Sequence, residues 1–285
     1  MGRRLVILTG LLLMTISSPL AWHAWGGHIK ELRVCGDPDN LPFSNKKLQG
    51  FENKIAEVIA KELGVELTYY WWPHQRGLIR RTLRAGQCDV LISIPEGWDP
   101  VLWTKPYYRS GYVFVYPKAR GFQVKSLDDP ILRQLKIGAY INSPPAEALA
   151  EKGIVKNVVG YNLLYDYKQD RPGKIIEDLI AGEIDVAAVW GPVAGYFVKK
   201  LNASYLEVVP LLDGDPATPF TFEFSMGVKE GDKALKADLE QAISKRQAEI
   251  RKVLEDYGVP LLPLLAKEQF GPVKERPGQI IYHRD

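Results

Sequence analysis

Leu83-Arg-Ala-Gly-Gln-Cys-Asp-Val90 and Leu179-Ile-Ala-Gly-Glu-Ile-Asp-Val186 are the two stretches that decide the fold. Each contains the end of a helix, a glycine suited to the left-handed position that follows it, and an Asp-Val pair typical of the start of a buried strand. One such octamer carries little information. Two of them, each with matching neighbours, predict that the chain contains two similar α/β halves.

The residues around the first octamer alternate between strand and helix patterns. Strands are predicted over Leu32–Cys35, Val65–Trp71 and Asp89–Ile94, and helices over Phe51–Leu63 and Leu78–Leu83. This β-α-β-α-β order predicts a parallel, doubly wound sheet with right-handed crossovers.

The second octamer has equivalent neighbours. Strands are predicted over Lys136–Tyr140 and Val158–Tyr161, and helices over Pro144–Lys152 and Pro172–Ala181. Ser143 is the predicted N-cap of the helix that starts at Pro144.

Two extended runs are expected to carry the chain between the halves. Tyr112–Tyr116 leaves the first half and Phe220–Val228 returns to it. Helical stretches at Asp232–Ser244 and Lys245–Tyr257 then pack onto the first half, and the proline-containing tail lies along the surface. We predict lobe 1 over 27–117 and 222–285, and lobe 2 over 118–221. The predicted fold class is α/β, with two doubly wound lobes and a hinged cleft between them.

Residues 1–26 have the composition of a secretory signal peptide. Arg3 and Arg4 precede the apolar run Leu5–Ile16, and Ala24-Trp-Gly26 is the best small-x-small cleavage site. The apolar run is short for a transmembrane helix, which needs about 20 residues. An uncleaved anchor is the alternative. We expect secretion to the periplasm and no stable membrane span after processing.

Cys35 and Cys88 are the only cysteines of the chain. A pair of cysteines in the periplasm raises the expectation of a disulfide. However, Cys35 ends one predicted strand and Cys88 opens another. If these strands pair in parallel, the two sulfur atoms lie at opposite ends, too far apart to bond. We expect two buried thiols, with a disulfide as the alternative.

Composition excludes several classes of function. The chain has 285 residues, 46% of them hydrophobic, which excludes disorder as its main state. Its 37 basic and 34 acidic residues leave a net charge of +3, so a dedicated nucleic-acid binder is not expected. Four histidines and no CxxC motif argue against a metal site, and no cofactor is predicted. The sequence also lacks GxSxG, HExxH, P-loop and dinucleotide-binding motifs, and we expect no enzyme.

Aromatic and polar residues are dense where the predicted strands end, which is where open α/β sheets bind ligands. Rings at these positions favour stacking onto a flat ligand or a partner side chain, and the alternative for most of them is packing in the lobe cores. The predicted cleft residues are Asp37, Asn40, Phe43, Trp72, Arg76, Glu96, Trp98, Tyr107, Tyr140, Ser143 and Trp190.

Some of these residues carry more specific hypotheses. Trp98 and Trp190 follow strands directly, next to glycine or proline, which favours a ligand-facing position. Arg76 either holds an anion or belongs to a solvated helix face. Two of the three acids Asp37, Glu96 and Asp99 could form a carboxylate pair, and the alternative is that these acids set the geometry of their turns.

Several of these segments resemble a known family. Leu32–Asn45, Gly50–Glu57 and Tyr107–Val115 are similar to type II periplasmic solute-binding proteins of the amino-acid-binding branch. The segments around Trp72–Gly77 and Trp190–Pro192 are similar to the J proteins of that family, which are encoded with PQQ-dependent methanol dehydrogenases. The likeness covers nearly the whole mature chain, from Glu31 to Leu264.

The departures from the amino-acid binders are as informative as the matches. Those proteins clamp the ligand carboxylate with an arginine shortly after the third strand, where this chain has Ile94–Asp99 and no arginine. They hold the ammonium group with an aspartate, where this chain has Trp190–Pro192. Free amino acids are therefore not expected as ligands.

The resemblance implies a non-catalytic periplasmic partner of a lanthanide- or calcium-dependent PQQ methanol dehydrogenase and its c-type cytochrome, which assists assembly or activation. The alternative is the substrate-binding receptor of an ABC importer for an aromatic or quinone-like solute. A third reading, a periplasmic lyase, requires an essential carboxylate such as Glu96 or Asp99.

Overall fold

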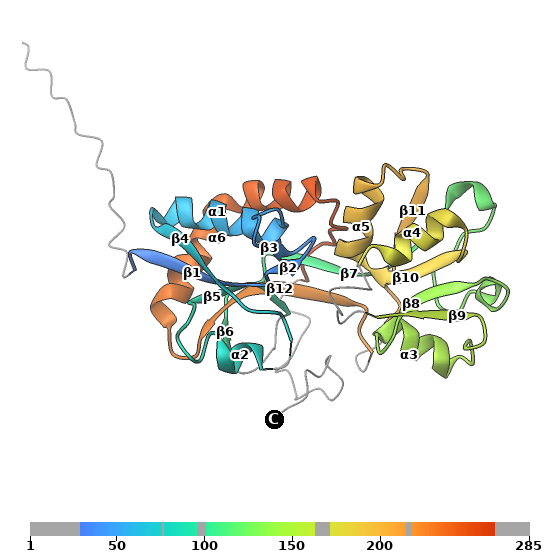
Figure 1. Cartoon of the computed structure of the whole chain (residues 1–285), viewed down its shortest axis with the longest axis horizontal. Helices are drawn as coiled ribbons and strands as arrows, with labels where there is room; N and C mark the ends of the chain where they lie inside the picture. The colour runs from blue at the N-terminus through green and yellow to red at the C-terminus, as the bar shows by residue number, and fades with distance from the viewer. Residues whose placement is uncertain (1–28, 76, 96–100, 163–171, 215–217, 266–285) are drawn as a thin grey trace, which may run out of the picture.

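The structure is a computed structural model that describes residues 29–75, 77–95, 101–162, 172–214 and 218–265. These residues form a mixed α/β fold with two halves side by side (Figure 1). The helices are α1 (Phe51–Leu63), α2 (Leu78–Arg81), α3 (Pro144–Glu151), α4 (Lys174–Ala181), α5 (Gly191–Lys200) and α6 (Lys233–Asp256), with 3-10 turns η1 (Lys118–Arg120) and η2 (Pro130–Arg133). The strands are β1 (Glu31–Gly36), β2 (Asp39–Asn40), β3 (Ser44–Asn45), β4 (Glu66–Trp71), β5 (Val90–Pro95), β6 (Val101–Trp103), β7 (Tyr108–Pro117), β8 (Ile137–Tyr140), β9 (Val158–Tyr161), β10 (Val186–Trp190), β11 (Leu206–Pro210) and β12 (Thr221–Lys229).

One large sheet runs through both halves, in the order β4-β1-β5-β12-β7-β10-β8-β9, with β6 beside β12 and β11 beside β7. β4, β1 and β5 are parallel, as are β10, β8 and β9. β7 is antiparallel to its neighbours: it pairs with β12 up to Gly111 and with β10 and β11 from Tyr112 onward. The predicted α/β, doubly wound architecture is confirmed. The lobe boundaries at 117/118 and 221/222 remain a prediction.

Both octamers have the predicted local structure. Gly86 has φ of +69° and Gly182 has φ of +77°, the left-handed conformation that glycine adopts without a steric penalty. Val90 and Val186 are the first residues of β5 and β10. The repeat therefore marks the same helix-to-strand turn in each half.

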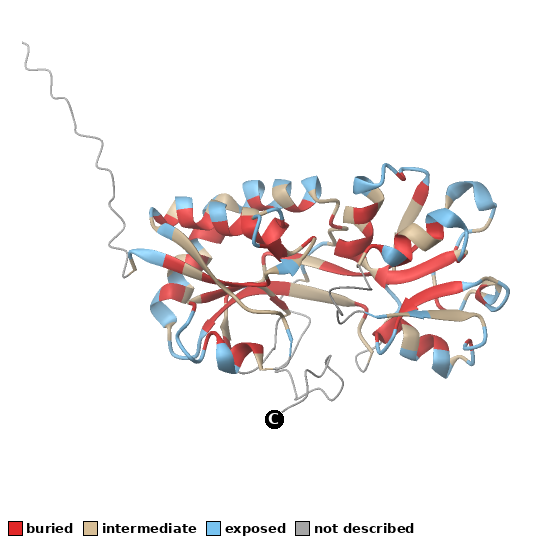
Figure 2. Cartoon of the chain, in the orientation of Figure 1, coloured by how far each residue is buried: buried red, intermediate tan, exposed pale blue. Residues whose placement is uncertain are grey.

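Helices cover both faces of the sheet, and the central strands are mostly buried, while the outer strand β4 is half-buried (Figure 2). In the first half, α1 and α6 pack on one face, and the buried residues of α2 pack on the other. In the second half, α3 covers one face while α4 and α5 cover the other. None of the described helices is long and apolar enough to cross a bilayer.

Two helices differ in detail from the prediction. α2 ends at Arg81 rather than Leu83, because the Thr82 hydroxyl donates to the Leu78 carbonyl and the backbone at Thr82 leaves the helical region. The two predicted C-terminal helices form one element, α6, with a kink at Arg246. The Arg246 guanidinium donates to Glu62 of α1 at 2.7 Å, which holds the kink against the first half.

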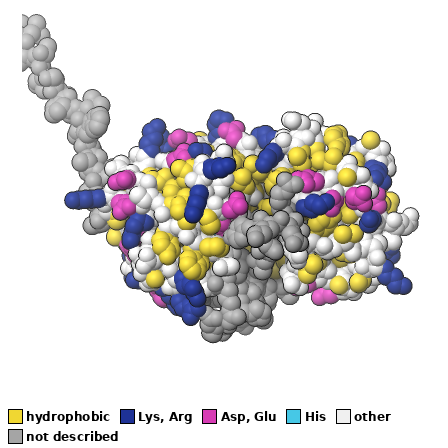
Figure 3. Space-filling view, in the orientation of Figure 1, with side chains coloured by type: hydrophobic (Ala, Val, Ile, Leu, Met, Phe, Trp, Pro, Cys, Tyr) yellow, Lys and Arg dark blue, Asp and Glu magenta, His cyan; other side chains and the backbone are white. Residues whose placement is uncertain are grey.

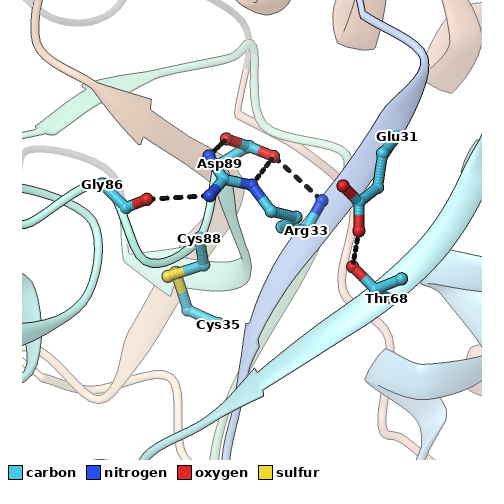
Figure 4. Close-up of polar contacts among 7 residues, drawn as sticks. All are labelled: Glu31, Arg33, Cys35, Thr68, Gly86, Cys88 and Asp89. Atoms are coloured by element: carbon cyan, nitrogen blue, oxygen red, sulfur yellow. Dashed lines mark hydrogen bonds and ion pairs between the residues drawn. A yellow bond between two sulfur atoms is a disulfide. The ribbon is translucent and has the colours of Figure 1, made fainter.

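The prediction of two free thiols is wrong, because Cys35 and Cys88 form a disulfide with Cα atoms 5.3 Å apart (Figure 4). The strands are parallel as expected, but they are staggered. β5 starts beside Val34, near the end of β1, so the residues before β5 lie next to the last residues of β1. Beside the disulfide, the Arg33 guanidinium donates to both carboxylate oxygens of Asp89.

Residues after α6 run back along the centre of the molecule. The Leu262 amide donates to the Arg109 carbonyl, and the Ser110 hydroxyl donates to the Pro260 carbonyl. This part of the tail lies on β7 as predicted for a surface segment. The rest of the tail lies outside the described residues.

Candidate functional site

The loop after β1 is built around Asp37, a buried carboxylate. One of its oxygens accepts from the Asp39 amide at 3.0 Å, and the other accepts from the His74 amide at 2.7 Å. Asn40 lies in the short β2 strand of this loop, and its carbonyl accepts from the Phe43 amide. Asp37 therefore sets the geometry of two loops, which is the structural alternative for this acid.

A buried acid that the sequence analysis did not select, Glu52, lies in the first turn of α1. The side chain is only 5% exposed, and burial raises the pKa of its carboxyl to about 8, while a hydrogen bond with Ser93 acts in the opposite direction. The Tyr107 hydroxyl lies 3.3 Å from the Ser93 hydroxyl and donates to the Ile92 carbonyl. The sequence offers only one signal for this position: Glu52 lies within Gly50–Glu57, a segment that resembles the solute-binding family.

Tyr107, Tyr140 and Ser143 are buried rather than directed into a cleft. Tyr107 belongs to the core beneath α1, and Tyr140 belongs to the core beneath α4 and α5, where its hydroxyl donates to the Pro172 carbonyl. Ser143 occupies the N-cap position of α3, but its hydroxyl donates to the Tyr140 carbonyl and makes no cap bond. Core packing, the alternative stated for the aromatic residues, holds for both tyrosines.

Trp190 lies where the two halves meet. It is half-buried and packs against three of the four hydrophobic clusters. Its ring contacts Tyr112 at 5.0 Å, Phe222 at 5.9 Å and Phe224 at 5.8 Å between centroids. Phe43 has a similar position, because it packs against one cluster from each half. We call these five rings the junction cluster.

Trp72 lies apart from the junction cluster. It is half-buried beside the disulfide, and the Arg81 guanidinium lies 5.4 Å from its ring centroid. The remaining predicted site residues, Arg76, Glu96 and Trp98, lie outside the described residues. In the part of the chain that is described, no three His, Cys, Asp or Glu side chains are grouped so that they could hold a metal ion.

The sequence profile of the bacterial extracellular solute-binding proteins, family 3, matches residues 32–259. The chain belongs to this family. Its membership confirms the predicted periplasmic-binding-protein fold and indicates a periplasmic protein. The signal peptide remains a prediction, because residues 1–28 lie outside the described residues.

Individual relatives are similar over most of their length. Protein MoxJ of Methylorubrum extorquens is 31% identical over 250 residues, which are 82% of each chain. Protein MoxJ of Paracoccus denitrificans is also 31% identical, over 81% of this chain and 89% of the relative. The crystal structure of the periplasmic binding protein XoxJ from Methylobacterium extorquens AM1 is 41% identical, with a TM-score of 0.69 over 82% of this chain and 100% of that one.

The junction cluster includes the residue at which β10 meets α5. Trp190 is the last residue of β10, and α5 begins at the next residue. A side chain on Gly191 would lie 2.4 Å from the Gly111 carbonyl, so α5 starts in direct contact with β7. At this point the chain has the Trp190 ring, which packs against other rings.

Proposed function

We propose that the chain is a non-catalytic periplasmic partner of a PQQ-dependent methanol dehydrogenase, using lanthanide or calcium, and of its c-type cytochrome. Its role is to assist assembly or activation of the dehydrogenase. Similarity to the MoxJ and XoxJ proteins over more than four fifths of the chain supports this proposal. The partner is inferred from the resemblance to the J proteins that are encoded with such dehydrogenases.

The junction cluster is the observation that carries the proposal. A free amino acid needs a cation for its carboxylate and an anion for its ammonium group. Where the resemblance to amino-acid binders leads us to expect the anion that holds the ammonium group, this chain has Trp190. Its ring packs edge-on against Tyr112 and Phe222. A ring surface of this kind favours the apolar side chains of a protein segment over a charged metabolite.

The contact surface between the lobes is part of the proposal. Phe43 and Trp190 are half-exposed and come from different halves, so a segment that touches both would bridge the lobes. Trp98 and Glu96 are assigned to the same surface from the sequence alone.

The test is to mix the purified chain with the dehydrogenase encoded by the same organism, and to measure complex formation and alcohol oxidation. We expect the wild type to bind and to raise the active fraction, Trp190→Ala to weaken binding, and Trp190→Phe to retain most of it because a ring remains. Unaltered activity and no complex at micromolar concentrations would exclude the proposal.

The receptor of an ABC importer is the second candidate, because half-exposed rings also stack on flat aromatic or quinone-like solutes. A receptor shows saturable quenching of tryptophan fluorescence and a rise in melting temperature with its ligand. We expect neither from a library of aromatic acids and quinones.

A further inference from the structure

Strand β4 is the outer edge of the sheet in the first half. It pairs with β1 alone among the described strands. The Glu66 amide donates to the Lys30 carbonyl, and the Trp72 amide donates to the Gly36 carbonyl. The even-numbered residues of β4 therefore direct their backbone amide and carbonyl groups toward β1. Because alternate residues of a strand point opposite ways, Leu67, Tyr69 and Trp71 direct their amide and carbonyl groups outward. Among the described residues, this row of backbone donors and acceptors has no partner strand.

The edge carries an unusual density of rings. Tyr69, Tyr70, Trp71 and Trp72 are all half-buried. Tyr69 and Trp71 stack on one face, with centroids 4.7 Å apart and planes 8° from parallel. Tyr70 and Trp72 pack on the other face, beside the disulfide. Rings therefore flank the open edge on both sides.

Gly36 fixes the position of two of these rings. A Cβ atom on Gly36 would lie 2.8 Å from the Trp71 ring and 3.1 Å from the Tyr69 ring. Both rings therefore occupy the space beside Gly36 that a side chain would fill, and this packing orders them before any partner arrives. Pre-ordered tyrosine and tryptophan side chains lose little conformational entropy on binding.

Positive charge lies beside the rings. Arg81 and Arg84 are exposed. The Arg81 guanidinium lies 5.4 Å from the Trp72 ring centroid, so its charge lies directly against the rings. Figure 3 shows apolar side chains gathered on this half of the molecule, with Lys and Arg side chains at their lower border.

We propose that the open edge of β4, with the rings of Tyr69–Trp72 and the positive charge at Arg81 and Arg84, binds an extended acidic segment of a protein partner, which adds to the sheet as a further strand. The identity of that partner as the dehydrogenase rests on the proposed function. Backbone pairing supplies affinity, the rings supply anchors, and the arginines select carboxylate side chains. This surface is separate from the junction cluster.

A protein segment fits this surface better than the other occupants. An anionic membrane would use the rings and the arginines, but it would leave the edge amides and carbonyls unpaired. A second copy would place like-charged arginine clusters near each other if the two β4 edges paired. Only an extended acidic segment satisfies the edge, the rings and the charges together.

The test uses two ligands, the purified dehydrogenase and the synthetic peptide acetyl-EVEFEVE-amide, each titrated onto the full-length chain. Tyr69→Ala and Tyr69→Pro are the central pair of variants. Both lack the ring, and the proline variant also lacks the backbone amide proton at position 69. That amide faces away from β1, so its loss breaks no hydrogen bond between β4 and β1. Trp72→Ala and Arg81→Glu test the rings and the charge. Tyr205→Ala and Arg251→Glu change exposed residues elsewhere and are the matched controls.

We expect Trp72→Ala and Arg81→Glu to weaken binding of both ligands at least tenfold. Tyr69→Pro is expected to bind several-fold more weakly than Tyr69→Ala, Arg81→Glu to reduce the salt dependence, and the controls to match the wild type. Dehydrogenase binding that is equal in all variants overturns this inference and leaves the proposed function intact. Peptide binding that follows the pattern without any binding of the dehydrogenase overturns the proposed function alone.

The other occupants are measured directly. If the wild type binds neither the dehydrogenase nor the peptide, both this inference and the proposed function are overturned. Concentration-dependent dimerisation of the chain that Tyr69→Pro abolishes would identify a second copy as the occupant. Arg81-dependent cosedimentation with phosphatidylglycerol vesicles, without peptide binding, would identify a membrane instead, and either result overturns the inference.

Discussion

Opening the Cys35–Cys88 disulfide is expected to lower the free energy of unfolding by about 4 kcal/mol. The bond closes a loop with a sequence separation of 53 residues. For a loop of that length, the loss of entropy in the unfolded chain is about 14 cal/mol/K, which is about 4 kcal/mol at 25 °C. Both cysteines are 2% exposed, so the bond links the β1 end to the β5 start inside the core.

The assay is urea unfolding followed by tryptophan fluorescence, for the oxidised wild type and for Cys35→Ala/Cys88→Ala. With a slope of about 2–3 kcal/mol/M, the midpoint is expected to fall by about 1.3–2 M. The melting temperature is expected to fall by about 10 °C for a chain of this size. The double variant serves as its own control, because a reductant should shift the wild type and leave the variant unchanged.

Two results would refute this reasoning. Thiol groups can be titrated in the protein unfolded in urea without a reductant. Two free thiols per chain in that titration would show that the disulfide does not form. An unchanged midpoint in the double variant would show that the bond does not restrict the unfolded chain in the way that the loop-entropy argument requires.

Three further predictions follow from single residues. Burial raises the pKa of Glu52 to about 8, from about 4.5 when unfolded, so the folded state holds a proton that the unfolded state releases, and stability falls as pH rises between these values. Glu52→Gln should therefore gain stability relative to the wild type by up to about 1.4 kcal/mol per pH unit across that window, and urea midpoints that differ equally at pH 5 and pH 8 would contradict this. Gly195→Ala should destabilise by about 1–3 kcal/mol, because its Cβ would lie 1.7 Å from the Gly258 carbonyl and push α5 off the segment after α6; an unchanged thermal melt would show that this contact gives way freely. Trp190→Ala should cost about 2 kcal/mol through lost ring contacts and Trp190→Phe less, and the reverse order in thermal melts would argue against the junction cluster.

The architecture was predictable because local signals agree with it. Gly86 and Gly182 have the left-handed backbone that their position after a helix indicated, and Val90 and Val186 open the strands that were expected. Signals of this kind depend on residues close together in the chain, which is why the sequence alone carries them.

The features that the sequence did not reveal concern relations between distant residues. The disulfide was missed because the stagger of β5 against β1 is set by packing and not by either strand's own sequence. Tyr107 and Tyr140 were assigned to a cleft from their position at strand ends, but whether such a ring points into the core or out of it depends on the neighbouring helices. Glu52 was overlooked because its burial follows from the packing of α1 on the sheet.

The aromatic edge was visible in the sequence as Tyr69–Trp72, but its meaning was not. The sequence identified a strand there, and only the sheet order shows that this strand is an outer one. The ring stack on Gly36 likewise depends on the register of β1 against β4.

The most direct test of the central claim is a sedimentation-velocity titration of the purified chain against the PQQ-dependent methanol dehydrogenase of the same organism, with each of the common amino acids tested in parallel by calorimetry. A defined complex with the dehydrogenase, together with no heat of binding for any amino acid, is the predicted result. An amino acid that binds at micromolar concentration while the dehydrogenase sediments alone would contradict it.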